Sequence, residues 1–259
     1  MKFYLFGKKE ITVIGLCTIL TLTAIFAAAG GAVRATTASA ASKKLLPIYS
    51  VGREENDKIV SLSFDAAWGN EDTEKLIEIL AKYDVKATFF VVADWVDKYP
   101  ESVKALSDAG HEVMNHSTTH PHMASLSEEK IRQEIETCNK KIETITGRSP
   151  LLFRAPYGEY CDSLINTLSD MKMYCIQWDV DSLDWKDLSA QEITNRVVPQ
   201  VKSGSIVLFH NAALHTPEAL PGIIEALQAK GYKIVPISEN IYRDNYAIDH
   251  EGRQQPIAN

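Results

Sequence analysis

From residue 59 onward, short apolar segments alternate with longer amphipathic ones. The apolar segments have the length and composition of buried strands and cover 59–64, 87–92, 112–115, 151–154, 174–178, 205–209 and 233–235. Between them, apolar residues recur at spacings of three and four, which predicts helices over 71–83, 95–109, 127–146, 162–171, 191–201 and 218–230. This alternation predicts a parallel sheet with helices outside it, as a barrel or as an open sheet.

An uncharged apolar run of 23 residues, 11–33, precedes this pattern and follows a segment with three lysines. The run matches the roughly 20 residues that span a bilayer, and the positive charge before it would keep the N-terminus in the cytoplasm. Ala38-Ser39-Ala40 offers a cleavage site, so a removed signal peptide and a retained single-pass anchor both remain open. Both alternatives predict that the rest of the chain is extracytoplasmic. It would be secreted after cleavage, or anchored to the cell membrane without it.

The rest of the chain is long enough for one domain with its own core. We expect a signal peptide or membrane anchor over 1–34, a linker over 35–56, the folded domain over 57–240 and a polar tail over 241–259. The formal net charge is −7 and the sequence has no basic stripe, which argues against nucleic acid as a partner. We expect a monomer.

Histidines cluster in one stretch of the chain. Four of the seven, His111, His116, His120 and His122, fall within twelve residues. A helical turn would place His116 and His120 on the same side, where their imidazoles could share a metal ion. Taken alone, the spacing is also compatible with ordinary surface histidines.

The positions of polar residues relative to the strands indicate a site. In parallel α/β folds, ligands bind at the carboxyl ends of the strands. Asp65 follows the first predicted strand, His116 the third, Arg154 closes the fourth, Asp179 follows the fifth and His210 the sixth. Because the carboxyl ends of parallel strands lie at the same end of the sheet, the pattern favours a single active site.

These residue types suggest hydrolytic chemistry. Two imidazoles and a carboxylate would make the three-ligand open site of a hydrolytic zinc centre. Asp65 could be that carboxylate ligand, or the general base that activates a water, and His210 could protonate a leaving amine. The guanidinium of Arg154 could hold a carboxylate in place. Residues 178–185 interleave three carboxylates with two indoles, which suits a sugar-binding cleft or an exposed loop with buried tryptophans.

With these residues in view, the sequence resembles the polysaccharide deacetylases of carbohydrate esterase family 4, the NodB homology domain. The resemblance covers roughly residues 57–238, and the sequence looks most like the subgroup that includes sporulation-associated deacetylases of spore-forming bacteria. It rests on five ordered motifs: Ser63-Phe64-Asp65, His116 to His120, Arg154 to Gly158, Asp181 to Trp185 and Leu208-Phe209-His210.

The resemblance implies a distorted (β/α) barrel of about seven parallel strands. It also implies removal of N-acetyl groups from amino sugars with a divalent metal, commonly zinc. By the same resemblance, Asp65 is the base, His116 and His120 are metal ligands and His210 is the acid.

The remaining motif positions correspond to supporting roles. The resemblance implies that Arg154 orients the base and that Asp184 orients the acid. It places the backbone N–H of Tyr157 at the oxyanion, and it places Trp185 and Leu208 in the acetyl pocket.

One position departs from the family pattern. The first motif usually has a second aspartate that binds the metal, and here that residue is Ala66. Asn70, Glu71 and Asp72 are candidate substitutes in the following loop, and Asp65 itself is another. With two imidazoles alone, a metal would bind more weakly.

We therefore expect a deacetylase of an N-acetylated glycan polymer such as peptidoglycan. The alternative suggested by Ala66 is a non-catalytic glycan-binding or envelope-assembly protein on a deacetylase scaffold. A metal-dependent esterase or small-amide hydrolase would share the site and differ only in its cleft.

Overall fold

The computed structural model describes residues 44–54 and 56–257. The predicted signal peptide or anchor at 1–34 lies outside these ranges, as do residues 35–43 and 55 of the predicted linker. Within the described ranges, none of the helices combines the length and the apolar character needed to cross a membrane.

The main sheet is parallel and curled. Its strands are β2 (Ile59–Ala66), β3 (Thr88–Val91), β4 (Glu112–Asn115), β5 (Leu152–Phe153), β6 (Tyr174–Cys175), β7 (Val180–Asp181) and β8 (Ile206–His210). They follow the order β6-β5-β4-β3-β2-β8-β7, and β9 (Lys233–Ile234) pairs with the start of β2. The order ends at β6 on one side and β7 on the other, so the curled sheet is an incomplete barrel. The expectation of an α/β fold with about seven parallel strands is confirmed.

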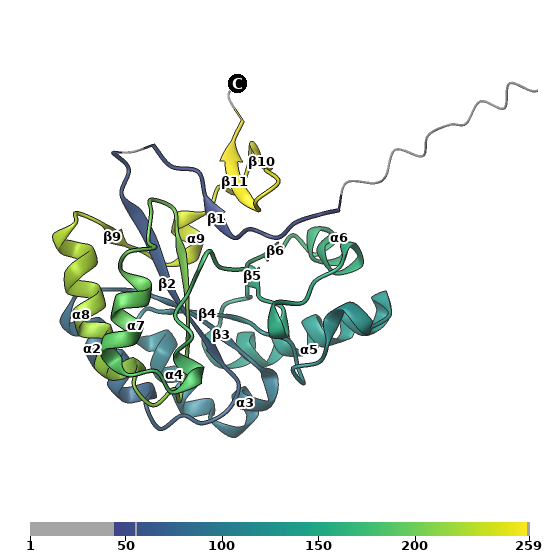
Figure 1. Cartoon of the computed structure of the whole chain (residues 1–259). Coiled ribbons are helices and arrows are strands. Elements are labelled where there is room, and N and C mark those ends of the chain that lie inside the picture. The colour runs from purple at the N-terminus through teal and green to yellow at the C-terminus, as the bar shows by residue number, and fades with distance from the viewer. Residues whose placement is uncertain (1–43, 55, 258–259) are drawn as a thin grey trace, which may run out of the picture. The chain divides into compact units, whose positions relative to one another are not determined.

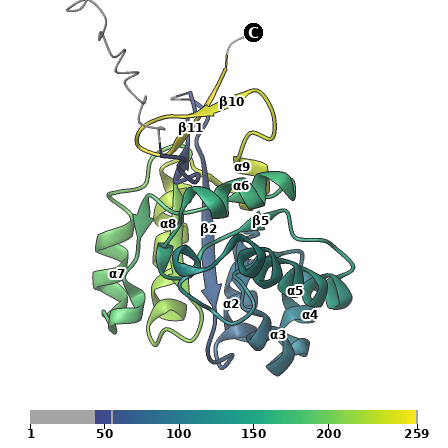
Figure 2. The same cartoon turned by 90° about the vertical axis from the view of Figure 1, so that its right-hand side faces the viewer.

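Helices surround this sheet. They are α2 (Thr73–Lys82), α3 (Ala93–Lys98), α4 (Pro100–Asp108), α5 (Glu128–Thr146), α6 (Asp162–Asp170), α7 (Ala190–Val197), α8 (Thr216–Ala229) and the short α9 (Ile237–Asn240). Neighbours contact one another in the order α7, α8, α2, α4, α5, α6, as the two views show (Figure 1, Figure 2). The single helix expected over 95–109 is two, because Pro100 lacks an N–H and begins a new helix.

Alternation along β2 separates the two faces of the sheet. Phe64 and Ala66 belong to the apolar cluster between the sheet and the helices. Ser63 and Asp65 point to the other face, where both contact the side chain of Arg154. Because β2 lies in the middle of the sheet, its inner polar residues lie inside the curl, near the carboxyl ends of the strands.

The ends of the described chain form a second, small sheet. Its strands are β1 (Ser50–Val51), β11 (Arg253–Pro256) and β10 (Tyr246–Ile248), in that order. In Figures 1 and 2, β2 runs toward the end of the domain where α3 lies, and the small sheet is at the opposite end. The segments expected as a linker and a polar tail therefore contain strands at these residues. The buried side chain of Gln254 accepts a hydrogen bond from Tyr242 N at 2.8 Å and donates one to Tyr242 O at 2.7 Å. Side-chain hydrogen bonds of this kind fix the polar C-terminal segment in place, although its sequence shows no apolar periodicity.

Candidate active site

A cleft of about 470 Å³ opens at the carboxyl ends of the strands. Seven of the predicted site residues line it: Asp65, His116, His120, Tyr157, Trp185, Leu208 and His210. Arg154 and Asp184 are buried, and each contacts one of these residues. The structure thus brings together all nine residues to which the resemblance assigns a role, from loops and strands that are far apart in the sequence.

Asp65 and Arg154 form a buried ion pair at the bottom of the site. Arg154 Nη1 donates to Asp65 Oδ1 at 2.8 Å, and Nη2 donates to Ser63 Oγ at 2.8 Å and to Gln177 O at 3.2 Å. Burial raises the pKa of Asp65, but the charges of Arg154, His116 and His210 outweigh it and lower the pKa overall. Asp65 is therefore an ionised carboxylate in a fixed orientation.

His116 is oriented by a backbone carbonyl. Its Nδ1 lies 2.8 Å from Arg154 O, and because a carbonyl only accepts, Nδ1 carries the proton. Nε2 then presents a lone pair, 3.6 Å from Asp65 Oδ2. Burial lowers the pKa of His116 more than the Asp65 charge raises it, so the neutral imidazole is favoured. A neutral imidazole with a free Nε2 is the form that binds a metal.

His120 reaches the site without a helix. Ser117 and His120 both have left-handed backbones, with φ of 76° and 56°, so the predicted helical turn over 116–120 is wrong. Pro121 disfavours the helical region at His120, and Ser117 Oγ accepts from His120 N at 3.0 Å. The rings of His116 and His120 still lie 5.0 Å apart between centroids. Burial, followed by the neighbouring His116, lowers the pKa of His120 to about 4.

The side chains predicted to substitute for the missing metal ligand make contacts away from His116 and His120. The amide of Asn70 donates to Ser102 Oγ at 3.0 Å, and Asp72 Oδ2 accepts from Ala212 N at 2.8 Å. The carboxylate of Glu71 lies against Gly69 of its own loop. None of the three replaces the carboxylate missing at Ala66.

The donor set therefore falls short of a catalytic zinc centre. Such centres use three protein ligands and an open position. His116 and His120 supply two imidazoles, but in the part of the chain that the structure describes no three His, Cys, Asp or Glu side chains are grouped closely enough to hold a metal ion. The Cβ of Ala66 lies in the outer apolar cluster. As the side chains lie, they do not fit a complete zinc site.

His210 is supported by a buried carboxylate. Its Nδ1 lies 2.7 Å from Asp184 Oδ1, and Asp184 Oδ2 accepts from His210 N at 2.8 Å and from Thr216 Oγ1 at 2.7 Å. Burial lowers the pKa of His210, but the hydrogen bond and charge of Asp184, with Asp65 and Asp181, raise it overall. The arrangement favours a protonated imidazole with Nε2 available to the cleft, which is the form that a general acid needs.

Aromatic side chains form the rim. Tyr157 lies in a short 3₁₀ turn, η3 (Pro156–Gly158), with φ of 59°, a backbone strain that is typical of functional sites. Trp185 lies in another, η4 (Asp184–Lys186). Asp179 is also expected at this site because it follows a predicted strand, but it lies just before β7, where its carboxylate accepts from Ser205 Oγ and Ile206 N, both at 2.8 Å. Sequence reasoning assigned no role to Trp68, which lines the cleft.

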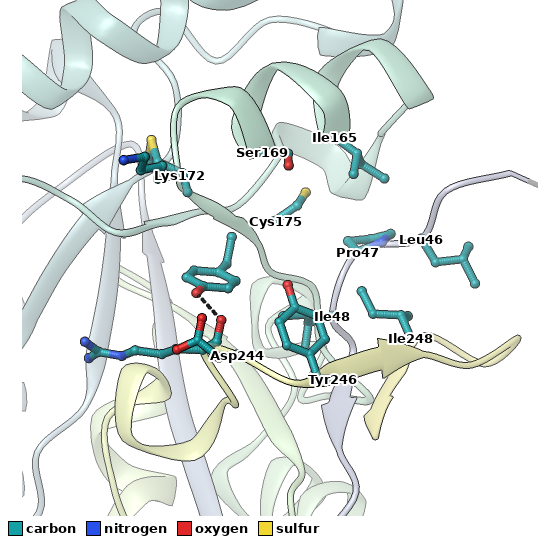
Figure 3. Close-up of a pocket in the computed structure, with 13 residues that line it drawn as sticks. Leu46, Pro47, Ile48, Ile165, Ser169, Lys172, Cys175, Asp244, Tyr246 and Ile248 are labelled. Atoms are coloured by element: carbon teal, nitrogen blue, oxygen red, sulfur yellow. Dashed lines mark hydrogen bonds between the residues drawn. The ribbon is translucent and has the colours of Figure 1, made fainter. Parts of the chain in front are cut away.

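A second cavity, of about 420 Å³, lies beside α6 and β6 (Figure 3). Residues 46–48, the segment before β10 and β10 itself form its other walls. None of the predicted site residues lines it, and the Tyr174 hydroxyl there donates to the carbonyl of Arg243 at 2.8 Å. The acid and base candidates thus belong to the cleft at the carboxyl ends of the strands.

Known proteins match this sequence and its fold. The Polysaccharide deacetylase family profile matches residues 52–176. A peptidoglycan-N-acetylglucosamine deacetylase of Bacillus cereus is 32% identical over 193 residues, which cover 73% of this chain and 70% of that protein. The chain belongs to the polysaccharide deacetylase family. The uncharacterized protein YlxY of Bacillus subtilis is also 32% identical over 193 residues, and the chain spans only 60% of its length.

One similar solved structure is that of a protein described as a pseudoenzyme. Wild-type BA3943 from Bacillus anthracis, described as a CE4 family pseudoenzyme, has a TM-score of 0.72 at 38% identity, over 77% of this chain and 70% of that one. A mutant of BA3943 is described as having restored enzymatic activity. The family therefore includes proteins that keep the fold without the reaction.

Proposed function

We propose that the chain is a hydrolase that removes N-acetyl groups from a cell-envelope polysaccharide such as peptidoglycan. The observation that carries this proposal is the pair of opposed groups on neighbouring strands. Asp65, held as a carboxylate by Arg154, lies in register with His210, which Asp184 supports. A base and an acid that line one cleft are what amide hydrolysis requires.

In this proposal Asp65 takes a proton from a water molecule while the oxygen of that water attacks the acetyl carbonyl carbon. The backbone N–H of Tyr157 would stabilise the resulting oxyanion. His210 then gives its proton to the amine nitrogen as the C–N bond breaks, which releases acetate and a free amino sugar. Arg154 and Asp184 act as positioning residues because each holds one of the two reacting groups. A divalent metal, with zinc the expected ion, would bind at His116 and His120 more weakly than at a three-ligand site.

Acetate release from N-acetylglucosamine oligomers tests this function. We expect the chain to release acetate when supplied with zinc, cobalt, nickel or manganese, and we expect His116→Ala to abolish the release. His111→Gln is a matched control, because His111 is also buried but accepts from Ala87 N at 3.2 Å away from the cleft. Unchanged release by His116→Ala would refute the proposed site.

A second candidate function is a non-catalytic glycan-binding protein on this scaffold. Ala66 and the incomplete donor set favour it, and BA3943 is a pseudoenzyme of similar structure. Elemental analysis and the acetate assay separate the two. A purified chain that holds no stoichiometric metal and gains no activity from added metal would favour the non-catalytic function over the hydrolase, and metal-stimulated release would exclude it.

We also propose that the domain works outside the cytoplasm, anchored by or cleaved from its apolar N-terminal run. An N-acetylated envelope polymer would be accessible there. A role in sporulation is an expectation from the resemblance alone. Fractionation of cells that express the full chain, with protease protection of the domain in intact cells, tests the location.

A further inference from the structure

Exposed aromatic side chains concentrate at the cleft. Trp68, Tyr157 and Trp185 are 63%, 58% and 57% exposed, and all three line it. Large apolar side chains left in water on a folded domain commonly mark a binding surface. Tyr157 and Trp185 belong to motifs already considered, whereas Trp68 has no assigned role.

Trp68 is the end of a row of rings along one side of the cleft. Its ring centroid lies 5.6 Å from that of His120, which lies 4.6 Å from that of Tyr157. His122 stacks on Tyr157 at 4.4 Å and 16°, and Glu159 orients it through a 2.9 Å hydrogen bond to Nδ1. The row therefore extends from His120 in two directions, to Trp68 on one side and to Tyr157 and His122 on the other.

The loop that carries Trp68 is held in place. The carbonyl of the next residue, Gly69, accepts from Trp95 Nε1 at 2.9 Å and from the side-chain amide of Asn211. Trp95 is buried in the outer core. An exposed indole on an anchored loop presents a flat apolar face at little entropic cost, as binding surfaces do.

We propose that Trp68 binds the sugar ring next to the one that loses its acetyl group. A pyranose has an apolar face of C–H groups, which stacks on an indole, and a rim of hydroxyls that stays in water. Trp68 lies on the His120 side, so a neighbouring sugar of a polymer would reach it while the acetyl group lies near Asp65 and His210. The chain would then select polymers over single sugars. This inference rests on the proposed function for the substrate class.

Binding by the full-length Asp65→Asn chain, in which turnover is slowed, tests the inference. Titration calorimetry with the N-acetylglucosamine hexamer and with the monomer gives two dissociation constants. We expect Trp68→Ala to weaken hexamer binding about tenfold and monomer binding about twofold or less, and Trp68→Phe to recover most of the loss. Ile257→Ala is the matched control, because Ile257 is also exposed and lies outside the cleft.

The outcomes separate this inference from the function itself. Equal losses for hexamer and monomer, unchanged hexamer binding by Trp68→Ala, or no hexamer binding by the parent chain would each overturn the role of Trp68. A length-dependent loss without acetate release from the chain with native Asp65 would support Trp68 and count against the proposed reaction.

Discussion

Replacing Asp65 by asparagine is expected to reduce kcat for acetate release about 10²- to 10⁴-fold. In the native chain Arg154 Nη1 donates to Asp65 Oδ1 at 2.8 Å. The amide oxygen of asparagine can accept the same hydrogen bond, so the side chain at residue 65 keeps its place. It cannot accept a proton from water, so the base is lost while the cleft persists. The measurement is acetate release from the N-acetylglucosamine hexamer under saturating metal.

Asp179→Asn is the matched control for this change. Asp179 also lies beside β8, where its carboxylate accepts from Ser205 Oγ and Ile206 N, but it lies outside the cleft. We expect Asp179→Asn to lower the melting temperature and to retain kcat. Comparable loss of kcat in both variants, or retained kcat in Asp65→Asn, would contradict the assignment of Asp65 as the base.

Much of this site could be predicted because strand ends and chemistry coincide. In a parallel sheet, the residue after each strand is placed by the strand itself, so Asp65, His116 and His210 converge once the strands are recognised. Local apolar periodicity is enough to recognise strands of this kind. The same reasoning fails for Asp179, because β7 is a strand of only two residues with no apolar run of its own.

The loop that carries the histidines could not be predicted from its own residues. Its backbone amides at Thr118 and Thr119 donate to Glu134 Oε2 at 2.8 and 2.9 Å, and Glu134 lies on α5. Asn115 Oδ1 accepts from Ser117 N at 2.7 Å and supports the left-handed backbone there. Two histidines spaced four residues apart can therefore lie side by side in a loop as well as in a helix, and here contacts with α5 determine the shape of that loop.

Trp68 illustrates a different limit of the sequence. Its neighbours Ala67 and Gly69 indicate only a loop, and a tryptophan in a loop is as compatible with burial as with exposure. The contacts that leave it in water come from Trp95 on α3 and from Asn211 after β8. Exposure is a property of the assembled fold, so the binding residue emerges only with the structure.

Arg154→Met is expected to lower the free energy of unfolding by about 3–5 kcal/mol at pH 7. Arg154 is fully buried and is the counter-ion of Asp65, so the substitution leaves a buried carboxylate without its partner. Methionine fills much of the volume beside Phe90, whose ring centroid lies 4.2 Å from the guanidinium carbon. Urea unfolding monitored by circular dichroism measures the effect.

The pH dependence of Arg154→Met follows from the sign of the Asp65 shift. In the native chain the pKa of Asp65 is lowered, so its stabilisation is present above the unfolded pKa of about 3.9 and is lost as pH falls through the folded pKa. Without Arg154, burial raises the pKa of Asp65. The stability difference between the two chains should therefore be largest at neutral pH and shrink as pH falls. The acid limb of kcat/KM should move to higher pH, because the base protonates earlier.

The double variant Asp65→Asn/Arg154→Met separates the ion pair from packing. If the cost of Arg154→Met is mainly an unpaired carboxylate, removing that charge recovers stability, and the double variant should be more stable than Arg154→Met alone. Each single change leaves one buried group without its charged partner, and the double change leaves neither. Additive losses would mean that Arg154 stabilises the domain through Ser63 and Gln177, to which Nη2 donates at 2.8 and 3.2 Å, and not through the base.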